Sequence, residues 1–148
     1  MTSSSVGAFF WSFMALELSQ LHRLLQNPVG STVAGVLPAS VAQHFGCTLG
    51  IAYLSSKSRK HIVTDHADIQ LLDVLHMPDM ISNGLWIADR PNSACVVYSP
   101  PDTTNLHYAS GLKVVGGGFE PYMCSFYRIG TRQITAKRRR GLILQEQR

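Results

Sequence analysis

Acidic residues are scarce in this sequence and do not cluster. The 148 residues include 9 Asp and Glu against 13 Lys and Arg, which gives a formal net charge of +4. A two-metal nuclease needs several carboxylates that converge on its ions, so this distribution argues against that class. The modest positive excess suits a polyanionic partner, although many enzymes with neutral substrates carry as much.

Cysteine is rare as well. Cys47, Cys95 and Cys124 are far apart in the chain and form no Cys-x-x-Cys pair. This spacing argues against a disulfide scaffold and against a structural zinc site. Because each cysteine stands in an apolar stretch, we expect buried free thiols and a cytoplasmic protein.

An uninterrupted apolar run is missing too. The segment 6–25 has no basic region before it, and four polar residues interrupt it. A membrane span needs about 20 nearly uncharged residues, so we predict neither a signal peptide nor a membrane partner. Apolar residues recur at helical spacing over 8–26, which predicts a helix. Its wide aromatic face would pack on the core, or would contact an inhibitor or a second copy of the chain.

Standard catalytic and nucleotide-binding fingerprints are also absent. The sequence has no phosphate loop, no dinucleotide glycine pattern after a strand, no HExxH and no Gly-x-Ser-x-Gly. The triple glycine at 116–118 lies between two expected strands and therefore predicts a hairpin turn. We expect no metal and no organic cofactor.

The hydrophobic periodicity changes from helical to strand-like near residue 84. The expected helices cover 8–26, 37–46, 57–66, 67–82 and 133–140, and the expected strands cover 47–54, 85–88, 94–98, 106–115 and 122–129. Helices followed by consecutive strands with short links predict an α+β fold. In it, N-terminal helices pack on one face of a four- to five-stranded, mainly antiparallel sheet.

The segment Ser55–His66 concentrates cations and two imidazoles directly after an apolar strand. Histidine acts as a general acid or base near neutral pH, and neighbouring cations suit a phosphodiester. At roughly 100° per residue, His61 and His66 point about 140° apart on a continuous helix. We favour His66 for the site, with Lys60 or His61 as its companion. A solvated helix face with incidental histidines explains the same residues.

A second cluster surrounds Arg128 at the end of an expected strand. Arg128 followed by Thr131 can present a fork donor and a hydroxyl to one phosphate. Strand alternation puts Tyr127 on the face opposite Arg128. An arginine on an edge strand that is simply exposed to water explains Arg128 equally well. Lys113 is ordinarily a strand residue exposed to solvent, and Tyr108 is ordinarily a residue that packs across strands.

Five short motifs follow one another in a fixed order: LPASVAQHFG, IAYLSSKSRKH, KHIVTDH, HYASGLKVV and SFYRIGT. This series resembles the phage-associated branch of the barnase/EndoU/colicin/RelE-like (BECR) ribonuclease superfamily over residues 36–135. The resemblance divides a single domain, 1–148, into a helical extension at 1–30, a nuclease-like core at 36–135 and a basic tail at 136–148.

The resemblance implies a four-stranded antiparallel sheet with a metal-independent endoribonuclease site. Carried over by position, the catalytic residues are Lys60, His61, His66, Arg128 and Thr131. Such families often serve as toxins in toxin–antitoxin or phage systems. The implied partners are therefore RNA (tRNA or mRNA) and a cognate antitoxin or immunity protein, and the N-terminal helix would also allow a homodimer.

The corresponding reaction is internal transesterification by the 2′-hydroxyl of RNA. His66 or His61 would take the hydroxyl proton, and His61 or Lys60 would protonate the leaving 5′-oxygen. Arg128 and Lys113 would stabilise the phosphate, and Thr131 would orient it or a water. The remaining expected substrate contacts are Lys57, which adds charge, and Tyr108 or Tyr127, which would stack a base.

Two other classes fit the same sequence. A non-catalytic module would use its basic residues only to neutralise phosphates, or its N-terminal helix to bind a partner protein. A histidine hydrolase or transferase would act on another phosphorylated or nucleotide substrate.

Overall fold

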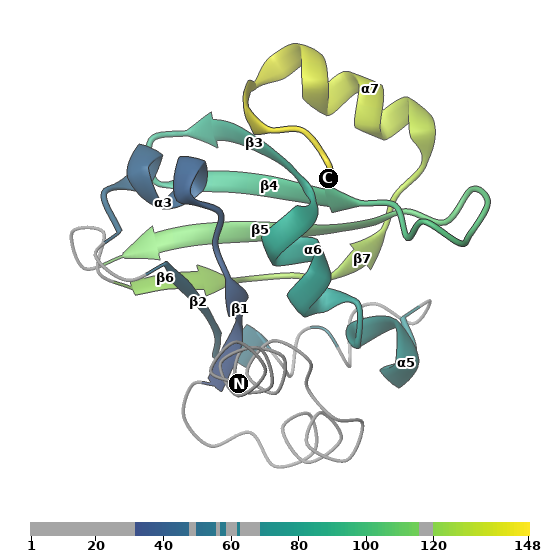
Figure 1. Cartoon of the computed structure of the whole chain (residues 1–148), viewed down its shortest axis with the longest axis horizontal. Coiled ribbons are helices and arrows are strands. Elements are labelled where there is room, and N and C mark those ends of the chain that lie inside the picture. The colour runs from purple at the N-terminus through teal and green to yellow at the C-terminus, as the bar shows by residue number, and fades with distance from the viewer. Residues whose placement is uncertain (1–31, 48–49, 56, 59–61, 63–68, 116–119) are drawn as a thin grey trace, which may run out of the picture.

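The computed structural model describes residues 32–47, 50–55, 57–58, 62, 69–115 and 120–148. These residues form an α+β fold built on one mixed eight-stranded sheet (Figure 1). The strands are β1 (Thr32–Val36), β2 (Ile51–Leu54), β3 (Leu85–Arg90), β4 (Ser93–Tyr98), β5 (Tyr108–Val115), β6 (Glu120–Met123), β7 (Tyr127–Arg128) and β8 (Leu142–Gln145). The helices are α3 (Ala39–Phe45), α5 (Leu71–Val74), α6 (Met77–Asn83) and α7 (Thr131–Arg140).

The sheet has the order β1-β2-β6-β5-β4-β3-β8. Strands β3, β4, β5 and β6 form an antiparallel meander, whereas β2 pairs in parallel with β6. The predicted strand at 122–129 is two strands that pair with different parts of β5. Between them, the Ser125 hydroxyl accepts a hydrogen bond from the Gly111 N–H at 3.0 Å, and the Ser125 carbonyl accepts one from the Ser110 hydroxyl.

Apolar side chains form a core on each face of the sheet, as strand alternation requires. The larger cluster joins the sheet to α3 and α6 and includes Trp86, Leu112 and Phe126. Figure 1 shows α6 crossing the sheet on this side. The smaller cluster contains Ile87 and Cys95 and packs against Ile134 of α7 on the opposite face.

The predicted arrangement, with N-terminal helices on one face of a four- to five-stranded sheet, is wrong. The segment 32–36, expected to be a connection, contains β-branched residues and pairs with β2 as β1. Residues 142–145, expected in a polar tail, pair with the edge strand β3 as β8. Helix α7 covers the face opposite α6, so the sheet carries helices on both sides. The expected helix at 8–26 and the turn at 116–118 lie outside the described residues.

The helix predicted over 67–82, with a kink or an end near Pro78, is two helices in the structure. Helix α5 ends at Val74, and α6 begins at Met77 with Pro78 in its first turn. Proline suits that position because a first-turn residue needs no backbone N–H donor. The break places residues 73 and 76 near the start of β5, where the candidate site lies.

The last four backbone carbonyls of α6 all accept hydrogen bonds, and three of them do so from donors outside the helix. The bonds are Gly84 N to Met80 O (2.9 Å), Trp86 Nε1 to Ile81 O (2.8 Å), Gln145 Nε2 to Ser82 O (3.2 Å) and Arg148 N to Asn83 O (2.9 Å). Two of the donors come from β8 and the residues after it. The C-terminal segment therefore fixes the end of α6 as well as the sheet edge.

Replacing Trp86 by phenylalanine should destabilise the fold by about 2 kcal/mol, because the variant leaves the Ile81 carbonyl without its donor and leaves a small void. Trp86 is fully buried. A lower urea midpoint with an unchanged m-value would show this loss. A Trp86→Phe protein as stable as the parent would mean that another donor replaces the indole.

Two further features concern the whole described chain. Cys47, Cys95 and Cys124 are free thiols, as predicted, although only Cys95 is buried. Within the residues that the structure describes, no helix is long and apolar enough to cross a membrane.

Candidate active site

A buried carboxylate, Asp73, joins α5 to the sheet. It accepts hydrogen bonds from the Tyr108 hydroxyl and, at 2.7 Å, from the Gln70 N–H. Nη2 of Arg128 lies 3.4 Å from both carboxylate oxygens. Asp73 is only 8% exposed, so these three donors replace the water that a carboxylate needs.

Local structure explains why these residues meet. Tyr108 and Arg128 are directly opposite each other in the antiparallel pair of β5 and β7, so their side chains share one face of the sheet. Asp73 stands in the first turn of α5, where its carboxylate accepts the N–H of the residue that precedes the helix. The same carboxylate thus caps the start of α5 and orients two residues from strands that are distant from it in the sequence.

The surroundings of Asp73 favour its charged form. Burial by itself would raise the pKa of this carboxyl, but the hydrogen bonds from Tyr108 and Gln70, together with the charge of Arg128, lower the pKa below its ordinary value. Burial and the hydrogen bond to Asp73 raise the pKa of Tyr108. Near neutral pH, the pair is therefore an ionised carboxylate and a protonated phenol.

Arg128 keeps donors for another anion. Its side chain is 45% exposed, and within the described residues only its Nη2 is hydrogen bonded. The distances of 3.4 Å exceed the 2.7–2.9 Å typical of a tight charge-assisted bond, so Asp73 orients the guanidinium without saturating it. A guanidinium has five N–H donors, and those that remain suit a phosphate or a carboxylate.

Aromatic rings surround the Tyr108 end of this cluster. Tyr108 stacks on His76 with ring centroids 5.3 Å apart and on Phe126 at 5.1 Å. The His76 ring also lies 6.2 Å from Tyr98. His76 thereby brings a half-buried imidazole beside the cluster.

The structure brings together only Tyr108 and Arg128 of the sequence-predicted site residues that it describes. Lys113 is five residues beyond Tyr108 on β5, so it points to the other face about 17 Å along the strand. Tyr127 packs with the smaller core cluster on that other face. Lys57 is exposed on a short helical turn, which the Ser55 hydroxyl caps by accepting the Ser58 N–H at 3.1 Å.

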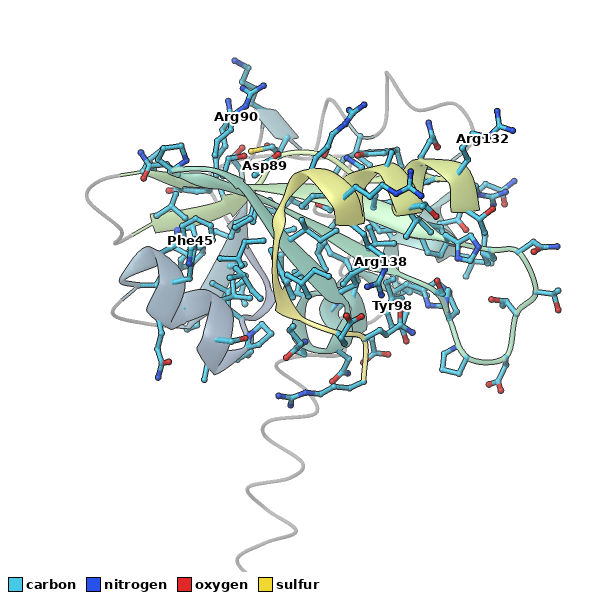
Figure 2. All side chains as sticks on the ribbon, turned by 90° about the horizontal axis from the view of Figure 1, so that it is seen from above. Phe45, Asp89, Arg90, Tyr98, Arg132 and Arg138 are labelled. Carbon is cyan, nitrogen blue, oxygen red and sulfur yellow. The ribbon has the colours of Figure 1, made fainter. Side chains whose placement is uncertain are left out.

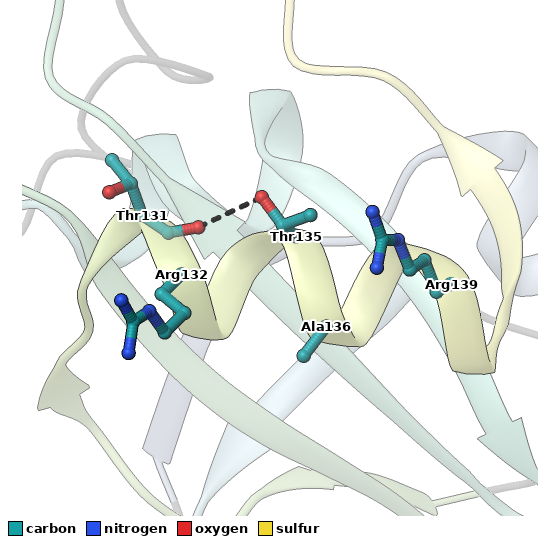
Figure 3. Close-up of a pocket in the computed structure, with 5 residues that line it drawn as sticks. All are labelled: Thr131, Arg132, Thr135, Ala136 and Arg139. Carbon is teal, nitrogen blue, oxygen red and sulfur yellow. Dashed lines mark hydrogen bonds between the residues drawn. The ribbon is translucent and has the colours of Figure 1, made fainter.

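Thr131 begins α7 and is exposed. Its carbonyl accepts a hydrogen bond from the Thr135 hydroxyl at 3.1 Å (Figure 3). With Thr135 and three other residues of α7, Thr131 lines a shallow surface groove of about 430 Å³. Lys60, His61 and His66 lie outside the described residues, so their catalytic roles stay predictions.

Sequence reasoning missed Asp73 and His76. Asp73 had a weak local signal, because an acid in the first turn of a helix often caps it. Its ion pair with Arg128 joins residues 55 positions apart, and no short-range sequence pattern could indicate such a contact. His76 stands just before Pro78, where the sequence predicts a kink or an end of the helix, and it lies in the turn between α5 and α6.

The described residues contain no group of three or more His, Cys, Asp or Glu side chains that could hold a metal ion. The candidate site is thus a carboxylate-oriented guanidinium beside an imidazole and buried aromatic rings. No protein-family model matches the chain, and comparison with curated proteins and with solved structures finds no significant match.

Proposed function

We propose that the chain is a metal-independent endoribonuclease whose Arg128 binds the scissile phosphate. One observation carries this proposal: a partly exposed guanidinium is held by a buried carboxylate and still has free donors. Such a preorganised donor stabilises the charge that grows on the equatorial phosphate oxygens during transesterification. A metal is not needed, because RNA supplies its own nucleophile, the 2′-hydroxyl.

The proton transfers are assigned to the histidine-rich segment. His66 or His61 would act as the base, and His61 or Lys60 as the acid, as the sequence predicts. His66 precedes Gln70 by four residues in the sequence. Gln70 donates directly to Asp73. His76 is a second candidate for the same work, because its ring stacks on Tyr108.

Asp73 and Tyr108 act as positioning residues in this proposal. Tyr108 is 1% exposed, with His76 and Phe126 against its ring, so it has no surface on which a base could stack. Its hydroxyl instead holds Asp73, and Asp73 holds Arg128. Base stacking would fall to the half-exposed His76 ring or to residues outside the described part of the chain.

A non-catalytic RNA-binding module is the second candidate. The exposed arginines of α7, which need no catalytic site to bind phosphates, favour it. A cognate antitoxin or immunity protein, and a homodimer through the N-terminal helix, stay predictions, because that helix lies outside the described residues.

Incubation with single-stranded RNA separates the two candidates. The proposed enzyme should cut RNA equally well with and without EDTA, leaving a 2′,3′-cyclic phosphate and a 5′-hydroxyl. DNA and 2′-O-methyl RNA of the same sequence should remain whole, since neither has the nucleophile. Cleavage that stops in EDTA, or that extends to DNA, would contradict the mechanism. Binding of RNA without any cleavage would favour the module.

A further inference from the structure

Helix α7 carries more cations than the fold uses. Between Thr131 and Gln145 the sequence has five Lys and Arg residues and no acid. Lys137 is partly buried against the sheet, and interactions with Cys95 and Tyr127 raise its pKa. Arg138 forms a two-pronged ion pair with Glu146. Arg132, Arg139 and Arg140 are exposed, and none of them has an ion pair or hydrogen bond within the described residues.

Two of these arginines lie along one side of the helix. Arg132 and Arg139 are seven residues apart, which brings them to nearly the same face, about 10.5 Å apart along the axis. Thr135 and Ala136, with their small side chains, lie between them. Together with Thr131 these residues line the groove of about 430 Å³ (Figure 3). The groove therefore has a cation near each end and little bulk in the middle.

The chemistry of this groove fits a sugar–phosphate backbone. Arginine binds phosphate oxygens through two parallel N–H donors, and two arginines spaced along a helix can contact different phosphates of one strand. A helix that binds a membrane surface would expose large apolar side chains beside its cations. The exposed side of α7 has none, because Ile134 packs against the sheet.

The groove is also close to the candidate site in the chain. Arg128 precedes Arg132 by four residues, and only Ile129 and Gly130 separate β7 from α7. Figure 2 shows Arg132 at one end of α7, far from Arg90 at the other side of the molecule. A strand with one phosphate on Arg128 can therefore continue over the edge of the sheet to α7.

We infer that the α7 groove, lined by Thr131, Arg132, Thr135, Ala136 and Arg139, is the docking surface for the backbone of single-stranded RNA. This inference rests on the proposed function for its choice of RNA. The groove binds phosphates next to the one that is cut, and it contributes affinity and not chemistry.

Binding to 2′-O-methyl RNA tests the inference without cleavage. The probe is a fluorescent single strand of about 15 nucleotides, within the length range that such surfaces cover. The double variant Arg132→Gln/Arg139→Gln should bind about tenfold more weakly at low salt. Its plot of log affinity against log salt should be shallower by about 1.4, from two lost contacts of about 0.7 each. The control Arg90→Gln/Arg148→Gln, which removes the same charge elsewhere, should change affinity less than twofold.

Two results would overturn the docking surface: equal weakening in both double variants, or affinity of the α7 variant within twofold of the parent. Cleavage of ordinary RNA keeps the two proposals apart. If RNA is cut in an Arg128-dependent way while the α7 variant behaves like the parent, only the docking surface fails. If the α7 variant loses affinity but the parent cuts no RNA, only the nuclease fails. If both hold, the α7 variant should raise KM and leave kcat nearly unchanged.

Discussion

Replacing Arg128 by glutamine should slow RNA cleavage by a factor of about 10²–10³, the usual cost of removing a preorganised donor to a transition-state charge. Glutamine keeps part of the side-chain length but loses the charge and the fork of donors. The fall should appear in kcat, because the interaction strengthens as charge grows on the phosphate. Initial rates on a single-stranded RNA in EDTA measure it directly.

Two further variants show whether the effect belongs to the guanidinium. Arg128→Lys should recover only part of the activity, since an ammonium keeps the charge and lacks the two parallel donors. Arg90→Gln removes an exposed arginine from the end of β3 and should cut RNA like the parent. An Arg128→Gln protein with the parent's circular dichroism and full activity would remove Arg128 from the mechanism.

Asp73→Ala should destabilise the fold by about 3 kcal/mol. The substitution leaves the buried Tyr108 hydroxyl without its acceptor and the Gln70 N–H without its cap. Urea unfolding measures the change. Asp89→Ala, which removes an exposed acid from β3, should stay within about 0.5 kcal/mol of the parent. A loss at Asp73 no larger than at Asp89 would mean that the cluster does not stabilise the fold.

The same carboxylate should make stability depend on pH in the acid range. Because the folded-state pKa of Asp73 lies below its ordinary value of about 3.9, its stabilising contribution is complete above that value. The contribution is lost as the pH falls through the lower, folded-state pKa. Unfolding free energies measured from about pH 6 down to pH 2 should therefore fall less steeply for Asp73→Asn than for the parent. Parallel curves would contradict the lowered pKa.

The strands that could be predicted from the sequence are those with clear alternation or clear turns. Segments 85–88, 94–98 and 106–115 are bounded by turns that contain proline or glycine, and all three overlap observed strands. Residues 32–36 and 142–145 were not expected to be strands, because each is short and gains its stability from pairing with β2 or β3. The parallel pair of β2 and β6 joins segments about 70 residues apart, which no local pattern encodes.

The candidate site, like the sheet, could be predicted from the sequence only in part. Arg128 stood out because a polar residue ends a strand there, but its partner Asp73 comes from a separate helix. The separation of Tyr108 from Lys113 could have been worked out beforehand. Residues whose positions differ by an odd number point to opposite faces of a strand, so positions five apart cannot share a face. The break between α5 and α6 falls next to Pro78, but the stacking of His76 on Tyr108 joins residues 32 positions apart and no local pattern encodes it.

The bonds that Gln145 and Arg148 make with the end of α6 have a consequence for protein synthesis. The ribosome makes these residues after every other described element, so a nascent chain lacks both the edge strand β8 and half of the donors for α6. Helix α6 adjoins the turn that holds His76, and this turn follows the helix of Asp73. Helix α6 therefore receives its full set of donors only when the last described residues have been made.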